Sequence, residues 1–219
     1  MSQDDSAIEI DYVVVDAVSS DGSQEILRRL AVEFPQMNLV IEPDSGQAEA
    51  LLKGFERSDA DLLGWVNADD ILLPGCVKAV AAVFADPATE VAYGRAWFID
   101  DKDRVTGAYP TASFDAEYLK TFCFLSQPST FFRRTAFERA GGIDPSLHYC
   151  LDYCLWIRFV KIQANFRVVD RYLSATRLHA STKTGTGGLD FVDEVMAMLE
   201  REIGTVPIEW RLYRAYRRR

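Results

Sequence analysis

The sequence predicts an α/β domain built on a mostly parallel sheet, and three observations support this fold class. In the first half of the 219 residues, three runs rich in Val, Ile or Leu alternate with two amphipathic stretches. The order strand, helix, strand, helix, strand favours parallel strands joined by right-handed crossovers. Apolar residues make up 48% of the chain and charged residues 26%, as in an ordinary globular protein with a buried core.

The elements of the first half follow from apolar periodicity and from turn residues. Strands are expected over residues 10–16, 38–42 and 62–66, because these short runs are apolar and end at polar residues. Helices are expected over 24–34 and 47–57, where apolar residues recur every three or four positions.

The second half is expected to fold onto the same sheet and to add late antiparallel strands and a C-terminal helix. The expected elements are a helix over 75–84, a strand over 90–100, an extended segment over 126–132, helices over 134–140 and 151–161, strands over 166–169 and 173–178, and a helix over 190–203. No linker or repeat divides the chain, so residues 1–219 are expected to form a single domain. Its parts are a disordered lead at 1–9, a core at 10–184, and a C-terminal helix with a basic tail at 190–219.

Charge and cysteine usage narrow the range of partners and compartments. The net charge of −9 disfavours nucleic acid as a partner, because phosphate backbones require basic surface. The cysteines match no zinc pattern, and a chain of this size needs no disulfides, so reduced thiols and a cytoplasmic location are expected. They are Cys76, Cys123, Cys150 and Cys154. No apolar run reaches transmembrane length, and the first five residues are too acidic to open a signal peptide.

Two adjacent carboxylates follow the third expected strand. Asp69 and Asp70 stand where a strand leaves the sheet, which is where open α/β sheets bind ligands. Two hard oxygen ligands suit Mg²⁺ or Mn²⁺, which in turn bridge phosphate oxygens. The alternative is that both residues cap the helix that Pro74 helps to start.

Five segments, taken in order, resemble family 2 of the glycosyltransferases. They are residues 12–23 (YVVVDAVSSDGS), 43–55 (PDSGQAEALLKGF), 64–75 (GWVNADDILLPG), 126–144 (SQPSTFFRRTAFERAGGID) and 149–159 (YCLDYCLWIRF). Each segment alone is weak, but five at the right spacing are specific, and the match spans about residues 10–184. The resemblance implies a GT-A-like fold, a nucleotide-sugar donor such as a UDP or dTDP sugar, and Mn²⁺ or Mg²⁺ as cofactor.

The resemblance also implies roles for individual residues. Asp152 would be the general base, and the other assignments fall into three groups. The donor-binding residues would be Asp16, Asp44, Lys53, Asn67 and Asp69; the metal ligands would be Asp69, Asp70 and His179; and Trp156 and Asp144 would lie on the acceptor side. For His179 a solvated loop position is an equal alternative, and for Lys53 a surface salt bridge is the more common fate.

The chemistry of sugar transfer agrees with this pattern. Transfer with inversion requires a carboxylate that takes the proton of the attacking acceptor hydroxyl. It also requires positive charge near the leaving diphosphate. Asp152 lies far along the chain from Asp69 and Asp70, so the two tasks can fall to separate carboxylates. From its position alone, Asp152 is better explained as an N-cap of the helix that it opens, and only the resemblance favours the role of base.

Two departures from the family pattern lead to further expectations. Asn67 stands where the family has an aspartate, which keeps hydrogen bonding but removes a charge. Only nine residues precede the strand at 10–16, whereas the family has a further strand and helix there. We therefore expect a chain that lacks the first βα unit or is a piece of a longer protein. The uncovered strand edge then predicts weak nucleotide binding and self-association as a homodimer.

The C-terminal residues 211–219 carry five arginines interleaved with apolar residues. They could contact anionic lipid headgroups at the inner membrane face, where a lipid-linked sugar would be met. On the sequence alone we favour a solvated helix end or the start of a further segment.

The function that these observations favour is an inverting, metal-dependent glycosyltransferase that acts on a glycan or lipid-linked acceptor. The alternative is an inactive or weakly active relic that serves as an interaction module. A sugar nucleotidyltransferase is disfavoured, because no glycine-rich, basic phosphate loop is visible near the start.

Overall fold

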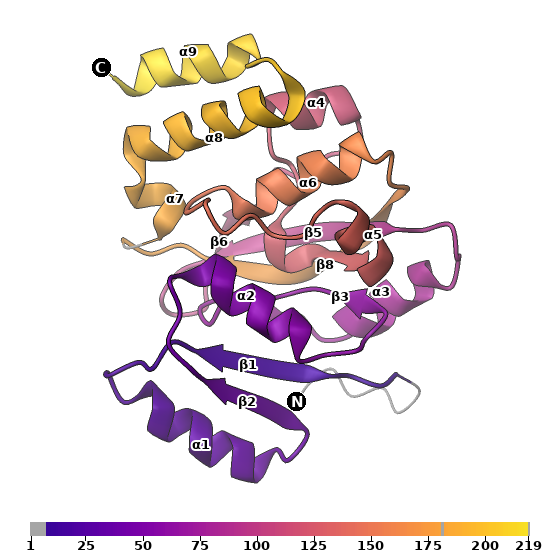
Figure 1. The fold of residues 1–219 in the computed structure, drawn as a ribbon, viewed down its shortest axis with the longest axis vertical. Coiled ribbons are helices and arrows are strands. Elements are labelled where there is room, and N and C mark those ends of the chain that lie inside the picture. Colours follow the sequence, from indigo (N-terminus) through magenta and orange to yellow (C-terminus); the bar gives the residue numbers. More distant parts are fainter. Residues whose placement is uncertain (1–7, 181, 219) are drawn as a thin grey trace.

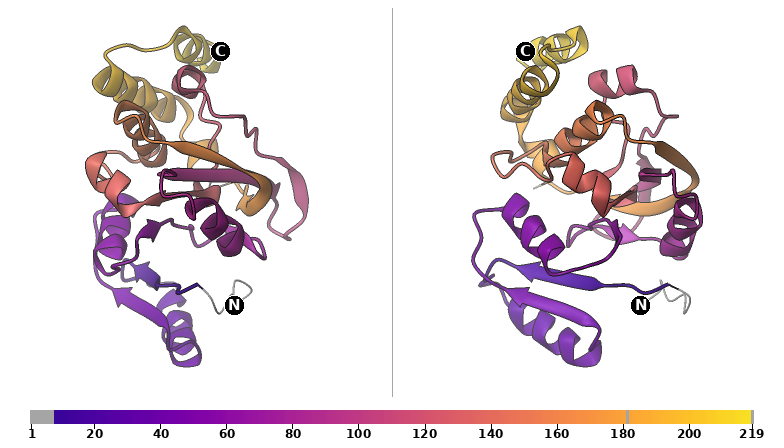
Figure 2. Two further views of the ribbon diagram at one scale, coloured as in Figure 1. Left: turned by 90° about the vertical axis from the view of Figure 1, so that its right-hand side faces the viewer. Right: turned by 45° about the vertical axis from the view of Figure 1, so that its right-hand side comes forward.

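The computed structural model describes residues 8–180 and 182–218 and confirms the expected α/β fold class. Most of the lead expected at residues 1–9 lies outside the described residues. Figure 1 shows a sheet at mid-height, with α6, α8 and α9 above it and the first βα elements below, and the two views in Figure 2 show the same order. The helices are α1 (Ser23–Glu33), α2 (Gln47–Glu56), α3 (Cys76–Phe84), α4 (Ala116–Thr121), α5 (Arg134–Arg139), α6 (Leu151–Lys161), α7 (Lys183–Thr186), α8 (Gly188–Ile203) and α9 (Ile208–Arg217).

The strands form two separate sheets. The strands are β1 (Tyr12–Asp16), β2 (Met37–Ile41), β3 (Leu62–Leu63), β4 (Ile71–Leu72), β5 (Val91–Ile99), β6 (Val105–Ala108), β7 (Thr130–Arg133) and β8 (Phe166–Arg177), and a 3₁₀ turn (Gln127–Ser129) leads into β7. β1 and β2 pair in parallel as a two-stranded sheet. The larger sheet has the order β3-β7-β5-β8-β4, and β6 pairs with the C-terminal residues of β5, beyond its pairing with β7.

The larger sheet contains antiparallel strands, as expected for the later part of the chain, but it has fewer parallel pairs than the mostly parallel sheet that was expected. Only β5 and β8 run parallel there, while β3, β4, β6 and β7 pair antiparallel to their neighbours. The reason is that β3 keeps only two paired residues, and its neighbour is β7 rather than β1. The first two crossovers therefore do not lead back into one continuous sheet.

Two hydrophobic clusters hold the larger sheet between helices. On one face α6 packs with Trp156 and Phe159 fully buried against Phe132 of β7. The centroid of the Phe132 ring lies 5.3 Å from that of Phe159 and 5.9 Å from that of Trp156. On the other face α3 packs Val80 against Leu173 of β8. Helix α2 contributes to the first cluster and also contacts β1, so it connects the small sheet to the large one.

Several local expectations are corrected. The strands expected at 166–169 and 173–178 form one strand, β8, and β4, α4 and α9 had not been expected. Asp69 and Asp70 do not cap α3, because β4 intervenes and Gly75 occupies the N-cap position. All four cysteines carry free thiols. Among the described residues, no helix has both the length and the apolar character needed to cross a bilayer.

Candidate active site

The donor-side residues begin where β1 ends. Asp16 is buried at the last position of β1, and its carboxylate accepts a hydrogen bond from the Ser19 amide at 2.9 Å. Asp44 accepts from the Gly46 amide with one oxygen, and its second oxygen is buried without a partner among the described residues. Lys53 donates to the Pro43 carbonyl and forms an ion pair with Glu49 at 2.9 Å. The Lys53 ammonium is therefore occupied by these two contacts, in agreement with the alternative of a surface salt bridge.

Asn67 is the centre of a cluster of amides. Its side-chain oxygen accepts a hydrogen bond from Gln47 at 2.7 Å, and its NH₂ group donates to Gln127 and to Asp70, both at 3.3 Å. Gln127 in turn donates to the carbonyl of Trp65 at 2.6 Å. An aspartate at position 67 could not donate to its neighbours. The asparagine therefore fits the two glutamines that surround it.

Asp70 is held by the end of β8. The backbone amide of Arg177 donates to the Asp70 carboxylate at 2.9 Å. The Arg177 guanidinium donates to the carbonyls of Asp69 and Asp100 at 2.9 and 2.6 Å. Burial, together with a smaller effect of the neighbouring Asp69 carboxylate, raises the pKa of Asp70 to about 6. Arg177 thus ties the Asp70 carboxylate and the Asp69 backbone to β8 and to the end of β5.

Asp69 and His179 meet although they lie 110 residues apart. The imidazole Nε2 of His179 lies 3.1 Å from the Asp69 carboxylate, and both side chains are partly exposed. Within the part of the chain that the structure describes, no three His, Cys, Asp or Glu side chains form a ready metal cluster. One or two protein ligands nevertheless suffice for Mg²⁺ or Mn²⁺ when substrate phosphates supply the rest.

Asp152 stands in the first turn of α6 and is not its N-cap, which is Cys150. Its carboxylate accepts a hydrogen bond from the Tyr153 amide at 2.8 Å. Burial raises the pKa of Asp152 to about 6, against an ordinary value of 3.8. A carboxylate with a pKa near 6 is ionised at neutral pH yet accepts a proton more readily than an exposed one. The thiol of Cys123 lies close enough for the Asp152 charge to raise its pKa.

Trp156 and Asp144, the two residues expected on the acceptor side, make packing and ion-pair contacts around α6. Trp156 is fully buried and stacks on Trp65, with ring centroids 5.8 Å apart. It therefore supports, from the core, the segment that leads from Trp65 to Asn67. The Asp144 carboxylate is paired with Arg158 at 3.3 Å and with Arg201 at 2.6 Å. Both residues fix the surroundings of α6, and neither side chain is presented to open space.

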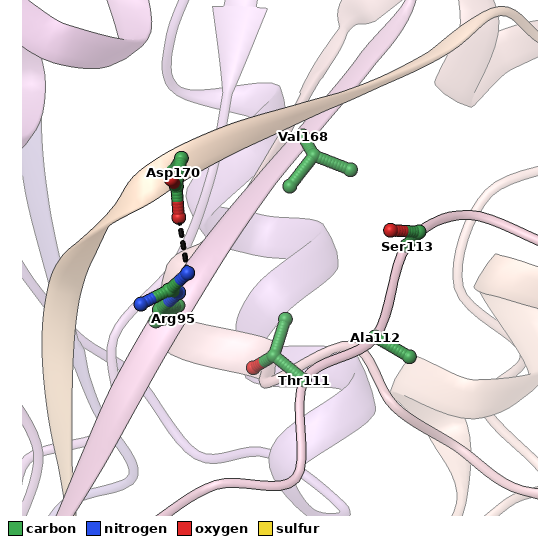
Figure 3. Close-up of a pocket in the computed structure, with 6 residues that line it drawn as sticks. All are labelled: Arg95, Thr111, Ala112, Ser113, Val168 and Asp170. Atoms are coloured by element: carbon green, nitrogen blue, oxygen red, sulfur yellow. Dashed lines mark ion pairs between the residues drawn. The ribbon is translucent and has the colours of Figure 1, made fainter.

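A separate pocket of about 380 Å³ lies beside the middle of β5 and β8, lined by Arg95, Thr111, Ala112, Ser113, Val168 and Asp170 (Figure 3). None of the residues singled out above belongs to this lining. Arg95 and Asp170 form an ion pair across it, as the dashed line in Figure 3 marks. The guanidinium is therefore neutralised by a neighbouring carboxylate, and the pocket does not concentrate positive charge for a phosphate.

The sequence analysis missed three polar residues that organise the site. Gln47 and Gln127 hold Asn67, and Lys183 lies with its ammonium 3.1 Å from the Gln47 side chain and 3.4 Å from the His148 carbonyl. Gln47 and Gln127 both fall within segments that carry the family resemblance, so their position was a usable signal. Lys183 had no such signal, because it follows the last of those segments.

Comparison with known proteins gives one family and a consistent fold. The family model described as glycosyl transferase family 2 matches residues 2–166. An uncharacterized glycosyltransferase of Nostoc sp. is 24% identical over 161 residues, which cover 67% of this chain and 50% of that protein. An uncharacterized glycosyltransferase of Rickettsia prowazekii is 23% identical over 193 residues, covering 83% of this chain and 60% of that one. The chain thus spans about half to three fifths of the length of these relatives.

Solved structures show the same fold. A crystal structure of residues 1–349 of S. aureus TarS in complex with UDP-GlcNAc superimposes with a TM-score of 0.68 at 16% identity, covering 99% of this chain and 62% of that one. The mannosyltransferase PcManGT from Pyrobaculum calidifontis, in complex with GDP-Man and Mn²⁺, gives a TM-score of 0.65 at 15% identity. That match covers 94% of this chain and 59% of that one.

Proposed function

This chain belongs to glycosyl transferase family 2, and on that premise we propose that it is an inverting, metal-dependent enzyme. It transfers a sugar from a UDP or dTDP sugar to a glycan or a lipid-linked acceptor in the cytoplasm. Nucleotide-sugar complexes of two proteins with the same fold support the donor class, and one of those complexes contains Mn²⁺. The observation that carries the proposal is the pairing of Asp69 with His179 at 3.1 Å beside the partly buried Asp70.

The residues at this point fit a divalent cation. Asp69 and His179 would hold it, with Asp70 close behind, and the donor's diphosphate would complete the coordination. When bound, the cation supplies positive charge for the leaving diphosphate. Arg177 keeps the Asp70 carboxylate and the Asp69 backbone in place through its backbone amide and its guanidinium. Lys183 adds a cation beside Gln47, on the side where the diphosphate would lie.

The remaining residues bind the donor and move one proton. Asp16 and Asp44 lie where β1 and β2 lead into α1 and α2, and each offers a carboxylate oxygen to the nucleoside. Asn67, fixed by Gln47 and Gln127, donates and accepts hydrogen bonds at the ribose. Asp152 takes the proton from the acceptor hydroxyl while the oxygen of that hydroxyl attacks the anomeric carbon of the donor sugar.

Calorimetry with UDP tests this proposal most directly. The wild-type chain should bind UDP in the presence of Mn²⁺ and much more weakly with EDTA, because the cation bridges the protein and the diphosphate. Asp69→Ala should abolish the Mn²⁺-dependent part of the binding. Equal UDP affinity with and without Mn²⁺ would refute the metal assignment, and transfer that survives in Asp152→Asn would refute the assignment of the base.

A further inference from the structure

Helix α9 presents an apolar face that nothing in the described structure covers. Ile208, Leu212 and Tyr216 are 59%, 62% and 73% exposed, and Ala215 between them is exposed as well. At about 100° per residue, these four side chains fall within roughly 100° of the helix circumference. They form one stripe, which we call the α9 face. Figure 1 shows α9 at the outer end of the molecule, above α8 and away from the sheet.

The opposite side of α9 is firmly attached to the domain. Trp210 is buried, its indole donates to the carbonyl of Lys120 at 3.2 Å, and its ring lies 6.0 Å from that of Tyr153. Arg214 forms an ion pair with Asp193 of α8, with a hydrogen bond of 2.9 Å. Because Trp210 and Arg214 lie on the side of the helix roughly opposite Leu212, the α9 face points outward. The orientation is therefore fixed by packing.

Positive charge borders one side of the α9 face although the chain as a whole is acidic, and Glu209 lies at the other border. The helix and its C-cap carry Arg211, Arg214, Arg217 and Arg218 against a single acid, Glu209, whereas the net charge of the chain is −9. Arg211 and Arg218 lie along one border of the apolar stripe, by the same helical spacing. An apolar stripe bordered by arginine is the pattern of a helix that lies in the headgroup region of an anionic bilayer.

A second copy of the chain fits this face less well than a bilayer does. Three exposed large side chains on a helix of ten residues fall far below the roughly 800 Å² per partner of a stable interface. Two such faces packed together would also bring their arginines close to one another. A membrane surface imposes neither condition, because it takes a small apolar stripe and supplies the opposite charge.

We propose that α9 docks the enzyme onto an anionic lipid surface, and that the acceptor is consequently a lipid-linked sugar. This rests on the proposed transferase function. The acceptor follows from how α9 is attached: Trp210 contacts Tyr153, which directly follows Asp152 in α6. The Tyr153 hydroxyl and the Trp210 indole both donate to the Lys120 carbonyl, at 2.9 and 3.2 Å, so α9, α4 and the start of α6 move together. Docking α9 on a bilayer thus holds the start of α6, with its base, near the headgroups.

Vesicle co-sedimentation of the 219-residue chain tests this surface. Vesicles of 30% phosphatidylglycerol in phosphatidylcholine should bind the wild-type chain, and vesicles of pure phosphatidylcholine should bind it much less. Leu212→Glu should weaken the binding to anionic vesicles at least tenfold. The matched control is Val32→Glu on α1, another helical apolar residue that is 82% exposed, and it should bind as the wild type does.

A second variant tests the electrostatic contribution of the arginines to vesicle binding. Changing Arg211 and Arg218 together to Gln should weaken binding to the anionic vesicles about 30-fold, at roughly fivefold for each arginine near the surface. Adding salt should have a similar effect on the wild type. Calorimetry with UDP and Mn²⁺ separates this inference from the proposed function, because Leu212→Glu leaves the donor site unchanged.

Two results would overturn the inference. One is equal binding of the wild type and Leu212→Glu to anionic vesicles, or no binding of either. The other is a wild-type dimer in light scattering that Leu212→Glu converts to a monomer, which would assign the α9 face to a second copy.

Discussion

Replacing Asp152 with Asn should inactivate the protein and stabilise it at the same time. The folded structure raises the pKa of this carboxyl from 3.8 to about 6 because burial disfavours the charged form. The folded state therefore binds the proton more tightly than the unfolded state does. The stability that the protonated carboxyl contributes is fully present below about pH 4 and is lost as the pH rises toward 6.

The size of the effect follows from the same shift. Each pKa unit corresponds to about 1.4 kcal/mol, which places an upper bound of about 3 kcal/mol on the cost of the charge. At pH 8 we therefore expect Asp152→Asn to raise the free energy of unfolding by about 1–3 kcal/mol, and at pH 4 to leave it nearly unchanged.

Sugar transfer should change in the opposite direction. An amide accepts no proton, so the turnover of Asp152→Asn should fall by about two to four orders of magnitude, while the affinity for UDP and Mn²⁺ stays the same. In the wild type, kcat should rise with pH up to about 6 and then level off.

Urea unfolding at pH 4 and pH 8 and a transfer assay check both effects. The control is Asp190→Asn, which makes the same chemical change at an exposed residue in the first turn of α8. It should change stability by less than about 0.5 kcal/mol at either pH. A variant of Asp152 that is less stable than the wild type at pH 8, or one that keeps normal turnover, would refute the reasoning.

Three further predictions concern the metal, the packing and the sheet edge. Asp69→Ala should lose Mn²⁺-dependent UDP binding in calorimetry with a change in Tm of at most a few degrees, while Asp101→Ala, in an exposed turn, should bind normally. Gly64→Ala would bring a Cβ within 2.6 Å of the Phe131 ring and should cost about 1–3 kcal/mol in urea unfolding, whereas Gly107→Ala, with 3.8 Å available, should be tolerated. β1 pairs only with β2 among the described strands, so we expect its second edge to drive homodimerisation and the affinity for UDP to be weak. A monomer in light scattering with micromolar UDP affinity would contradict that expectation.

Apolar periodicity in the sequence predicted the bounds of an element well where the side chains of that element alone determine them. The bounds expected for α6, 151–161, are those observed, because a helix with a fully apolar face ends where its periodicity ends. β8 was expected as two strands because Asp170 and Arg171 interrupt the apolar run. The structure keeps the strand continuous through a register shift opposite Gly94 and Arg95, which turns these polar residues outward. No pattern within one strand carries that information.

The candidate site was predictable in its carboxylates but not in what holds them. Asp69 and Asp70 were expected from their position after a strand. Their main support is Arg177, which binds Asp70 through a backbone amide, and every residue except proline has such an amide. Nothing in the side chain of Arg177 indicates that its amide is used in this way. The contact depends on β8 pairing with β4, and this pairing joins residues about a hundred positions apart.

The span between Asp69 and His179 has a consequence for how the protein matures. During synthesis the N-terminal carboxylates leave the ribosome long before the residues that hold them. A nascent chain that ends near residue 160 already contains Asp16, Asp69 and Asp152, yet it has neither Arg177 nor His179. Because the loop closed by these contacts is more than a hundred residues long, its ordering comes late in folding. The candidate metal site of Asp69 and His179 is therefore assembled only after residue 179 has been made.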